Sequence, residues 1–228
     1  MTKTFQIAID GPVAAGKGTV AKLVAGRLGF LYVDTGAMYR SLTLLANRSG
    51  VDWKNEDKMT TFVYETKPVV NLSVPGEGEK DGRLSTGTIG DEDISWLIRT
   101  EEISHAVGVV AQYKKVRAYV TEMARRIAGE QDVVMEGRDI TSVILPAAQL
   151  KIYMDANPMV RAKRRHDELL TRGDDVTLDQ VYQELMTRDE RDMRENLIKV
   201  PGVWVLDTTK MTIEEVVETI VKRVEEMK

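Results

Sequence analysis

This sequence of 228 residues contains no cysteine. That absence excludes disulfide bonds and thiolate metal sites, and it is compatible with a reducing compartment. Histidine is also scarce, and neither His105 nor His166 has a partner in the sequence that suggests a metal site or acid–base catalysis. No apolar run is long enough to cross a bilayer, and no N-terminal basic segment followed by an apolar stretch indicates a signal peptide. We therefore expect a cytoplasmic protein.

The sequence also lacks a strong excess of either charge. Lys and Arg number 32 and Asp and Glu number 36, which gives a net charge of -4. This balance does not suggest a nucleic-acid or membrane partner. The apolar share of 43% and the charged share of 30% are ordinary for a globular protein. The length suits one α/β domain with an addition, or two small domains, and we expect a monomer that acts on small molecules.

The most informative segment is a glycine-rich loop at residues 11–19. An apolar run at residues 5–10 predicts a buried strand before it, and helical spacing at residues 20–28 predicts a helix after it. Strand, loop and helix are the context that a phosphate-binding loop requires, which disfavours a turn without a ligand. The glycines permit the backbone to wrap around a phosphate, and the lysine can reach the outer phosphates. The expected ATP-binding residues are Gly11, Pro12, Val13, Ala14, Ala15, Gly16, Lys17, Gly18 and Thr19.

One position in this loop departs from the general pattern. Gly18 follows Lys17 where Ser or Thr is usual, and Thr19 comes one residue later. The Gly-Lys-Gly-Thr ending resembles the nucleoside monophosphate kinases, such as adenylate kinase. A nearby hydroxyl can hold the magnesium ion that accompanies ATP. The Gly18–Thr19 region and Glu136 are therefore candidate metal positions, although no side chain is assigned as a direct ligand.

Strand candidates alternate with helical segments along the chain. Together with the first strand, residues 30–33, 132–136, 150–155 and 203–207 predict an α/β fold with a five-stranded parallel sheet flanked by helices. Ligands of such sheets bind at the carboxyl ends of the strands, where the phosphate loop and Glu136 fall.

Residues 68–74 and 83–86, separated by turn residues, interrupt this alternation with a predicted antiparallel hairpin. We expect a small inserted domain at residues 68–108 and a core domain formed by residues 1–67 and 109–228.

Arginine residues occur where bound phosphate groups need them. Arg40 and Arg138 follow predicted strands, and further arginines cluster at residues 161–165 and 188–194. Guanidinium groups bind phosphate bidentately and stay charged, and phosphoryl transfer depends mainly on positioning and charge neutralisation. We therefore expect an arginine-rich lid at about residues 156–196. The predicted catalytic residues are Lys17, Arg138, Arg161 and Arg165.

Several segments together resemble bacterial cytidylate kinases. The most specific is Asp34-Thr35-Gly36-Ala37-Met38-Tyr39-Arg40, because general phosphate-loop proteins lack it; Gly137-Arg138-Asp139-Ile140 and Arg188-Asp189-Glu190-Arg191-Asp192 also match. The resemblance extends from about residue 7 to the C-terminus. It implies ATP as donor, CMP and dCMP as acceptors, a magnesium requirement, a P-loop kinase core, and a monophosphate-binding role for the insert.

The resemblance also implies roles for single residues in CMP binding. Thr35 and Arg40 would contact the monophosphate and its nucleoside, and Arg138 and Arg188 would bind phosphate. Arg117 and Asp139 would read the edge of cytosine, to whose donor and acceptors a carboxylate and a guanidinium are complementary. Asp192 would accept from the ribose hydroxyls. The residues alone also allow Asp139 to act as a helix cap or a partner of Arg138, and Asp192 to pair with Arg188.

Four segments depart from the family pattern. Glu136 stands in place of Asp, and Thr141-Ser142 in place of Gly-Thr. Gly108 stands in place of a serine that would help to bind the base, so that contact is either missing or supplied by Ser104. The segment Met193-Arg194-Glu195 should end in Arg, and we expect Glu195 to face solvent.

Three other functions compete with this interpretation. The first is another small-molecule or nucleoside monophosphate kinase, of the UMP or shikimate type, and the second is a nucleotide-binding module without activity. A GTPase is disfavoured because no Asn-Lys-x-Asp segment occurs.

Overall fold

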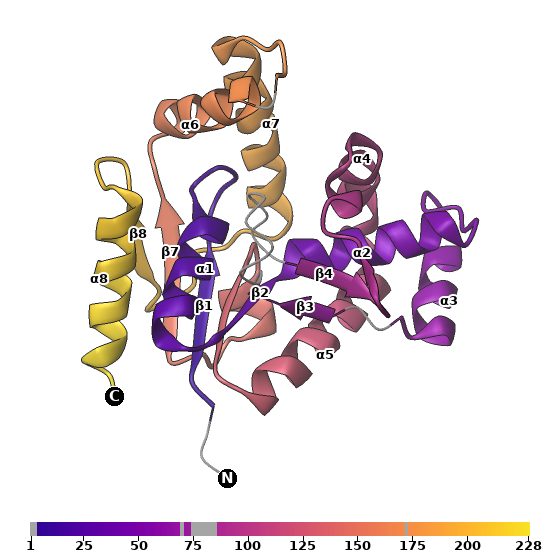
Figure 1. Ribbon diagram of the computed structural model, residues 1–228, viewed down its shortest axis with the longest axis horizontal. Coiled ribbons are helices and arrows are strands. Elements are labelled where there is room, and N and C mark those ends of the chain that lie inside the picture. Colours follow the sequence, from indigo (N-terminus) through magenta and orange to yellow (C-terminus); the bar gives the residue numbers. More distant parts are fainter. Residues whose placement is uncertain (1–3, 69–70, 74–85, 172) are drawn as a thin grey trace. The chain divides into compact units, whose positions relative to one another are not determined.

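A computed structural model of the chain describes residues 4–68, 71–73, 86–171 and 173–228 (Figure 1). Its main sheet has five strands in the order β2-β6-β1-β7-β8. These strands are β1 (Gln6–Asp10), β2 (Leu31–Asp34), β6 (Val133–Gly137), β7 (Leu150–Asp155) and β8 (Trp204–Asp207). Strand β7 pairs in parallel with both β1 and β8. The predicted α/β class with a five-stranded sheet and flanking helices is confirmed.

The chain divides into two compact units, which are described separately. We call residues 5–30 and 134–228 the phosphate-loop unit, and residues 31–133 with Thr4 the central unit. The predicted domain bounds, with an insert at residues 68–108 and a lid at about residues 156–196, remain a prediction. Within the described part of the chain, no helix is both long and apolar enough to span a membrane.

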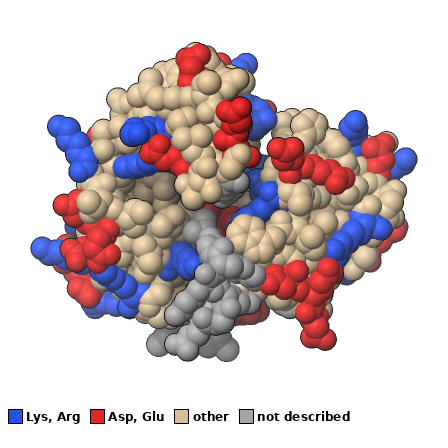
Figure 2. Space-filling view, turned by 45° about the horizontal axis from the view of Figure 1, so that its top comes forward, with Lys and Arg blue, Asp and Glu red and all other residues tan. Residues whose placement is uncertain are grey.

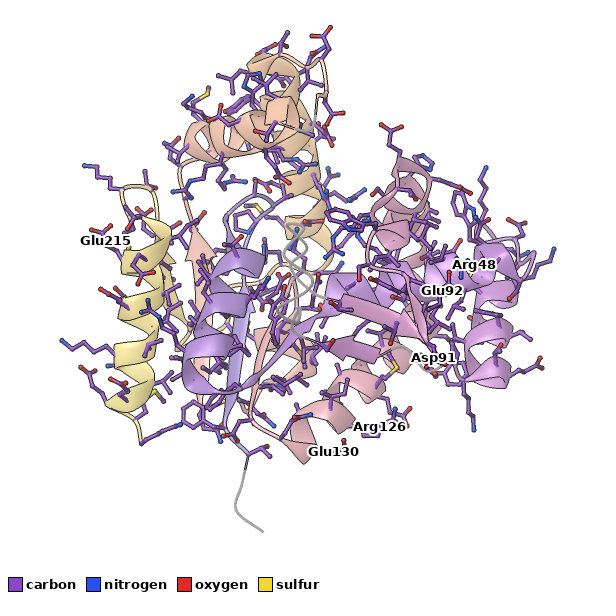
Figure 3. The ribbon with its side chains drawn as sticks, in the orientation of Figure 1. Arg48, Asp91, Glu92, Arg126, Glu130 and Glu215 are labelled. Carbon is purple, nitrogen blue, oxygen red and sulfur yellow. The ribbon has the colours of Figure 1, made fainter. Side chains whose placement is uncertain are left out.

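The described residues of the phosphate-loop unit form two pairs of adjacent α-helices. Its helices are α1 (Lys17–Leu28), α6 (Pro158–Thr171), α7 (Leu178–Glu195) and α8 (Ile213–Glu225). Helix α1 lies beside α8, and α6 lies beside α7 (Figure 1). Helix α8 begins as its sequence predicts, because Thr212 caps its N-terminus and Glu215, labelled in Figure 3, accepts from the Thr212 backbone N–H at 2.8 Å.

The part of the central unit that the structure describes contains four α-helices and a small antiparallel sheet. The helices are α2 (Thr35–Arg48), α3 (Glu56–Thr66), α4 (Glu101–Val110) and α5 (Lys114–Glu130), and the strands are β3 (Asn71–Ser73), β4 (Thr86–Ile89) and β5 (Glu92–Asp93). One buried cluster comprises Ala37, Leu44, Ile94, Ile98 and Ile103. At the surface, the Arg48 guanidinium donates to both carboxylate oxygens of Glu92 at 2.7 and 2.8 Å, which links α2 to β5 (Figure 3).

Side-chain caps define where two helices of the central unit begin. Helix α3 begins at Glu56, because Asn55 supplies its N-terminal cap. A 3-10 turn at Leu97–Arg99 precedes α4, which Thr100 caps. Strands β3 and β4 pair antiparallel, as the hairpin predicts, but most of the hairpin segment lies outside the described residues.

Candidate functional site

The loop between β1 and α1 has the backbone conformation that its glycines predict. A Cβ atom at Gly11 would lie 2.0 Å from the carbonyl oxygen of Met154, so no other residue fits there. Gly16 has φ 85° and is the N-terminal cap of α1, which has no side-chain capping bond and no acidic residue in its first turn. The N–H groups at this helix terminus therefore point to an open position that favours an anion. Ala14 also adopts a left-handed conformation, with φ 58°.

Lys17 begins α1 and is 5% exposed. Its Nζ donates to the carbonyl oxygen of Pro12 at 2.9 Å. Burial, with the neighbouring charge of Arg138, lowers the pKa of Lys17 to about 7, and the carboxylates of Glu136, Asp10 and Asp192 oppose that shift. A lysine in this environment gains from a nearby polyanion, because phosphate charge offsets the cost of burying an ammonium group.

Arg138, which follows β6, forms an ion pair with Asp192 of α7. Its Nε lies 2.7 Å from Asp192 Oδ2, and the two side chains are about one quarter and one eighth exposed. Asp192 thus has a partner beyond its own helix. Arg188 is half-buried on the same helix, and Asp139 is buried just before a π-helical turn at Ile140–Ile144.

Asp10, which sequence reasoning missed as a site residue, holds this π-helical turn in place. Its two carboxylate oxygens accept hydrogen bonds from the Ile140 N–H at 2.9 Å, the Thr141 N–H at 2.8 Å and the Thr141 hydroxyl at 2.6 Å. Its side chain is fully buried, and burial raises the pKa of Asp10 despite these bonds. The sequence does contain a signal for this role of Asp10. A carboxylate at the end of an apolar strand indicates a buried group with specific partners, because carboxylates are rarely buried without them.

Arg161, expected to act in catalysis, has its guanidinium inside the phosphate-loop unit. It is 3% exposed and pairs with the equally buried Asp189 at 2.6 Å. Its Nη1 donates to the carbonyl oxygen of Val13 at 2.9 Å. Asp189 was not anticipated, because one more acid in a heavily charged helix gives no sequence signal.

A cavity of about 420 Å³ lies beside the phosphate loop in the same unit. Its walls come from the loop and α1, from the end of β7, from α6 and from the start of α8; the residues are Ala14, Ala15, Gly16, Thr19, Val20, Met154, Arg164, Arg165, Glu168, Thr208, Met211, Thr212, Ile213 and Val216. Arg165 stands at this cavity, with Nη1 2.9 Å from Glu168 Oε2. A mostly apolar cavity with a few charged groups suits a nucleoside.

The central unit contains the remaining predicted residues. Thr35 is buried in the first turn of α2. Arg40 donates to the carbonyl oxygen of Ile98 at 3.1 Å and to the Ser104 hydroxyl at 2.7 Å, and Arg117 donates to the carbonyl oxygen of Ala111 at 3.0 Å. Ser104, the expected substitute for the serine missing at position 108, is therefore a partner of Arg40.

A family model described as cytidylate kinase matches residues 7–226. The chain belongs to the cytidylate kinase family. A cytidylate kinase of Bacillus licheniformis is 40% identical over 228 residues, which cover 99% of this chain and 98% of the relative. A cytidylate kinase of Carboxydothermus hydrogenoformans is 38% identical over 96% of both chains. An uncharacterised protein from Eubacterium ventriosum has a similar fold, with 11% identity and a TM-score of 0.55 over 98% of this chain and 99% of its own.

Two departures from the cytidylate kinase pattern have a structural account. Thr141, in place of glycine, adds a hydroxyl that donates to the buried Asp10 carboxylate. Glu195 is exposed, as expected. Arg194 is 78% exposed and lies 3.9 Å from Glu190, whereas Arg191 Nη2 lies 4.0 Å from Asp192. Arg191 and Arg194 both remain predicted substitutes for the missing arginine, and Arg191 is the less exposed of the two.

Proposed function

We propose that this chain transfers the terminal phosphoryl group of ATP to CMP or dCMP, giving ADP and CDP or dCDP. The full-length match to the cytidylate kinase family carries this proposal. The phosphate-loop unit supports it with chemistry of the required kind, since an uncapped helix terminus, Lys17 and the nearby charge of Arg138 suit a polyanion. No general base is needed, because the acceptor is an ionised phosphate.

For ATP, we assign the triphosphate to residues 11–19 and the adenosine to the adjacent cavity. Lys17 and Arg138 then stabilise charge on the transferred group, and Arg165 acts from the cavity wall. Arg161 acts indirectly, because its guanidinium nitrogens are bonded to Ala156, Val13 and Asp189. Lys17→Ala should lower kcat by about two orders of magnitude or more while the protein stays folded. Near-normal turnover would refute the assignment.

For CMP, the family resemblance supports Thr35, Arg40, Arg117, Arg138, Asp139, Arg188 and Asp192 as the binding residues. If Asp139 reads cytosine, Asp139→Asn should lower kcat/KM for CMP more than kcat/KM for UMP, because an amide can turn a donor toward the uracil carbonyl. The change in discrimination between the two substrates should correspond to about 1–3 kcal/mol. Asp192→Asn is the matched control, since the ribose is the same in both substrates. Equal losses on CMP and UMP in Asp139→Asn would contradict base reading.

A magnesium ion bound with ATP fits the side chains of the phosphate-loop unit. Magnesium sites beside phosphates need only one or two protein oxygens, because water and phosphate supply the rest. The Thr19 hydroxyl and the Glu136 carboxylate are the candidate oxygen groups, whereas the Asp10 carboxylate accepts three hydrogen bonds from the turn after β6. The ion would neutralise phosphate charge during transfer.

We further propose a cytoplasmic monomer without a nucleic-acid or membrane partner. Lys and Arg are interspersed with Asp and Glu over the face in Figure 2, and the net charge is -4, so neither feature favours a nucleic-acid or membrane partner. A coupled assay with ATP and a panel of CMP, dCMP, UMP, AMP, GMP and shikimate tests the function. Preference for CMP and dCMP is the expected result. Preference for UMP or shikimate would replace the assignment, and no turnover would favour a binding module.

A further inference from the structure

A buried ion pair connects the two helices α6 and α7 to the phosphate loop. Arg161 of α6 and Asp189 of α7 are 3% and 1% exposed, and their charged groups are 2.6 Å apart. The other two guanidinium nitrogens of Arg161 donate to the carbonyl oxygens of Ala156, at 3.0 Å, and Val13, at 2.9 Å. Burying two charges is costly, so a pair in this position stabilises the fold only where its bonding is satisfied.

This pair contacts both backbone polar groups of one loop residue. While Arg161 donates to the Val13 carbonyl, Asp189 Oδ1 accepts from the Val13 N–H at 3.4 Å. The two contacts span 148 and 176 residues of sequence, so distant segments constrain a single residue of the loop. Contacts on both sides of one residue limit rotation of the adjoining peptide groups.

The same helices also pack against the loop. Val13 and Ala14 lie against a buried cluster of Ala162, Val181 and Leu185, which come from α6 and α7. In Figure 1, α6 and α7 lie over the connection from β1 to α1. Ala14 has φ 58°, a conformation that alanine rarely adopts and glycine adopts readily. Surrounding contacts must therefore hold Ala14 in this conformation.

We infer that Arg161 and Asp189 are positioning residues, which act through Val13 to hold the phosphate loop in the conformation that receives the phosphates of ATP. Neither residue reaches the open side of the loop, so neither acts on the phosphates directly. The inference deepens the proposed function and rests on its assignment of ATP to this loop. A pair that only joined α6 to α7 would influence stability without influencing nucleotide affinity.

The test measures ADP binding by titration calorimetry, with magnesium and without an acceptor, in Asp189→Asn. ADP affinity should fall by on the order of tenfold, because an uncharged amide weakens both the ion pair with Arg161 and the bond from the Val13 N–H, while CMP affinity stays within about twofold. Glu190→Gln, the neighbouring exposed carboxylate, is the control and should bind ADP as the wild type does. Unchanged ADP affinity in folded Asp189→Asn would overturn the inference.

A second variant separates positioning from helix stability. Ala14→Gly in the Asp189→Asn background should restore part of the ADP affinity, because glycine adopts the left-handed conformation without outside constraint. A pair that only joined the helices would give no rescue, and that result would overturn the inference.

If Asp189→Asn does not fold, ADP binding to Arg161→Lys is the deciding measurement, since lysine keeps the buried charge but cannot bond to all three partners. Wild-type affinity in Arg161→Lys would then refute it. Wild-type protein that binds ADP but does not phosphorylate CMP would refute the proposed function alone.

Discussion

Lys17 should take up a proton when nucleotide binds. Burial and the charge of Arg138 lower its pKa from the usual 10.5 to about 7 in the nucleotide-free protein. Phosphate oxygens beside Nζ favour the charged form, so the pKa in the complex should return toward its usual value. At pH 8 about nine tenths of the free protein then has neutral Lys17, and binding takes up about 0.9 proton. The affinity of the protein for nucleotide should therefore fall by about tenfold as the pH rises from 8 to 9.

Calorimetric titration of ADP in buffers with different ionisation enthalpies measures this uptake, because the slope of the apparent enthalpy against buffer enthalpy gives the number of protons. Lys17→Met is the matched control, since it keeps the length of the side chain but cannot bind a proton. It should show weak affinity and no uptake at pH 8. A wild-type uptake near zero, or the same uptake in Lys17→Met, would refute the assignment of the lowered pKa to Lys17.

Three further predictions concern single positions. Thr141→Val should destabilise the fold by about 1.5–3 kcal/mol, because the Thr141 hydroxyl donates to the buried Asp10 carboxylate at 2.6 Å. Urea denaturation measures this loss, and Ser142→Ala, which removes a hydroxyl without a hydrogen bond in the described structure, should cost much less. Without nucleotide, the free energy of unfolding should rise from pH 7 to 10 more in the wild type than in Lys17→Met, because the unfolded chain keeps the Lys17 proton that the native state loses. Arg191→Ala should raise KM for CMP severalfold while Glu195→Ala does not; equal kinetics in the two variants would remove Arg191 from the site.

The phosphate loop could be predicted from the sequence because its geometry is local. Gly11 and Gly16 have the positive φ angles that their chemistry allows, and consecutive residues form the strand, loop and helix. Thr212 and Glu215 likewise form the predicted capping box, since both partners lie within one turn. The family also follows from contiguous motifs. These features depend on sterics and on hydrogen bonds between residues close in sequence.

Long-range partners were decided only by the tertiary structure. Asp192 pairs with Arg138, which lies 54 residues away in the sequence. Asp10 bonds to residues 130 and 131 positions later, and Arg161 turns toward Val13 and not toward the cavity. Helical and strand periodicity shows which residues share a face of an element, but not which element packs against that face. The cost of burying a charge depends on those packed neighbours, so the sequence alone determined the phosphate loop, while the folded chain selected the partners of its charged residues.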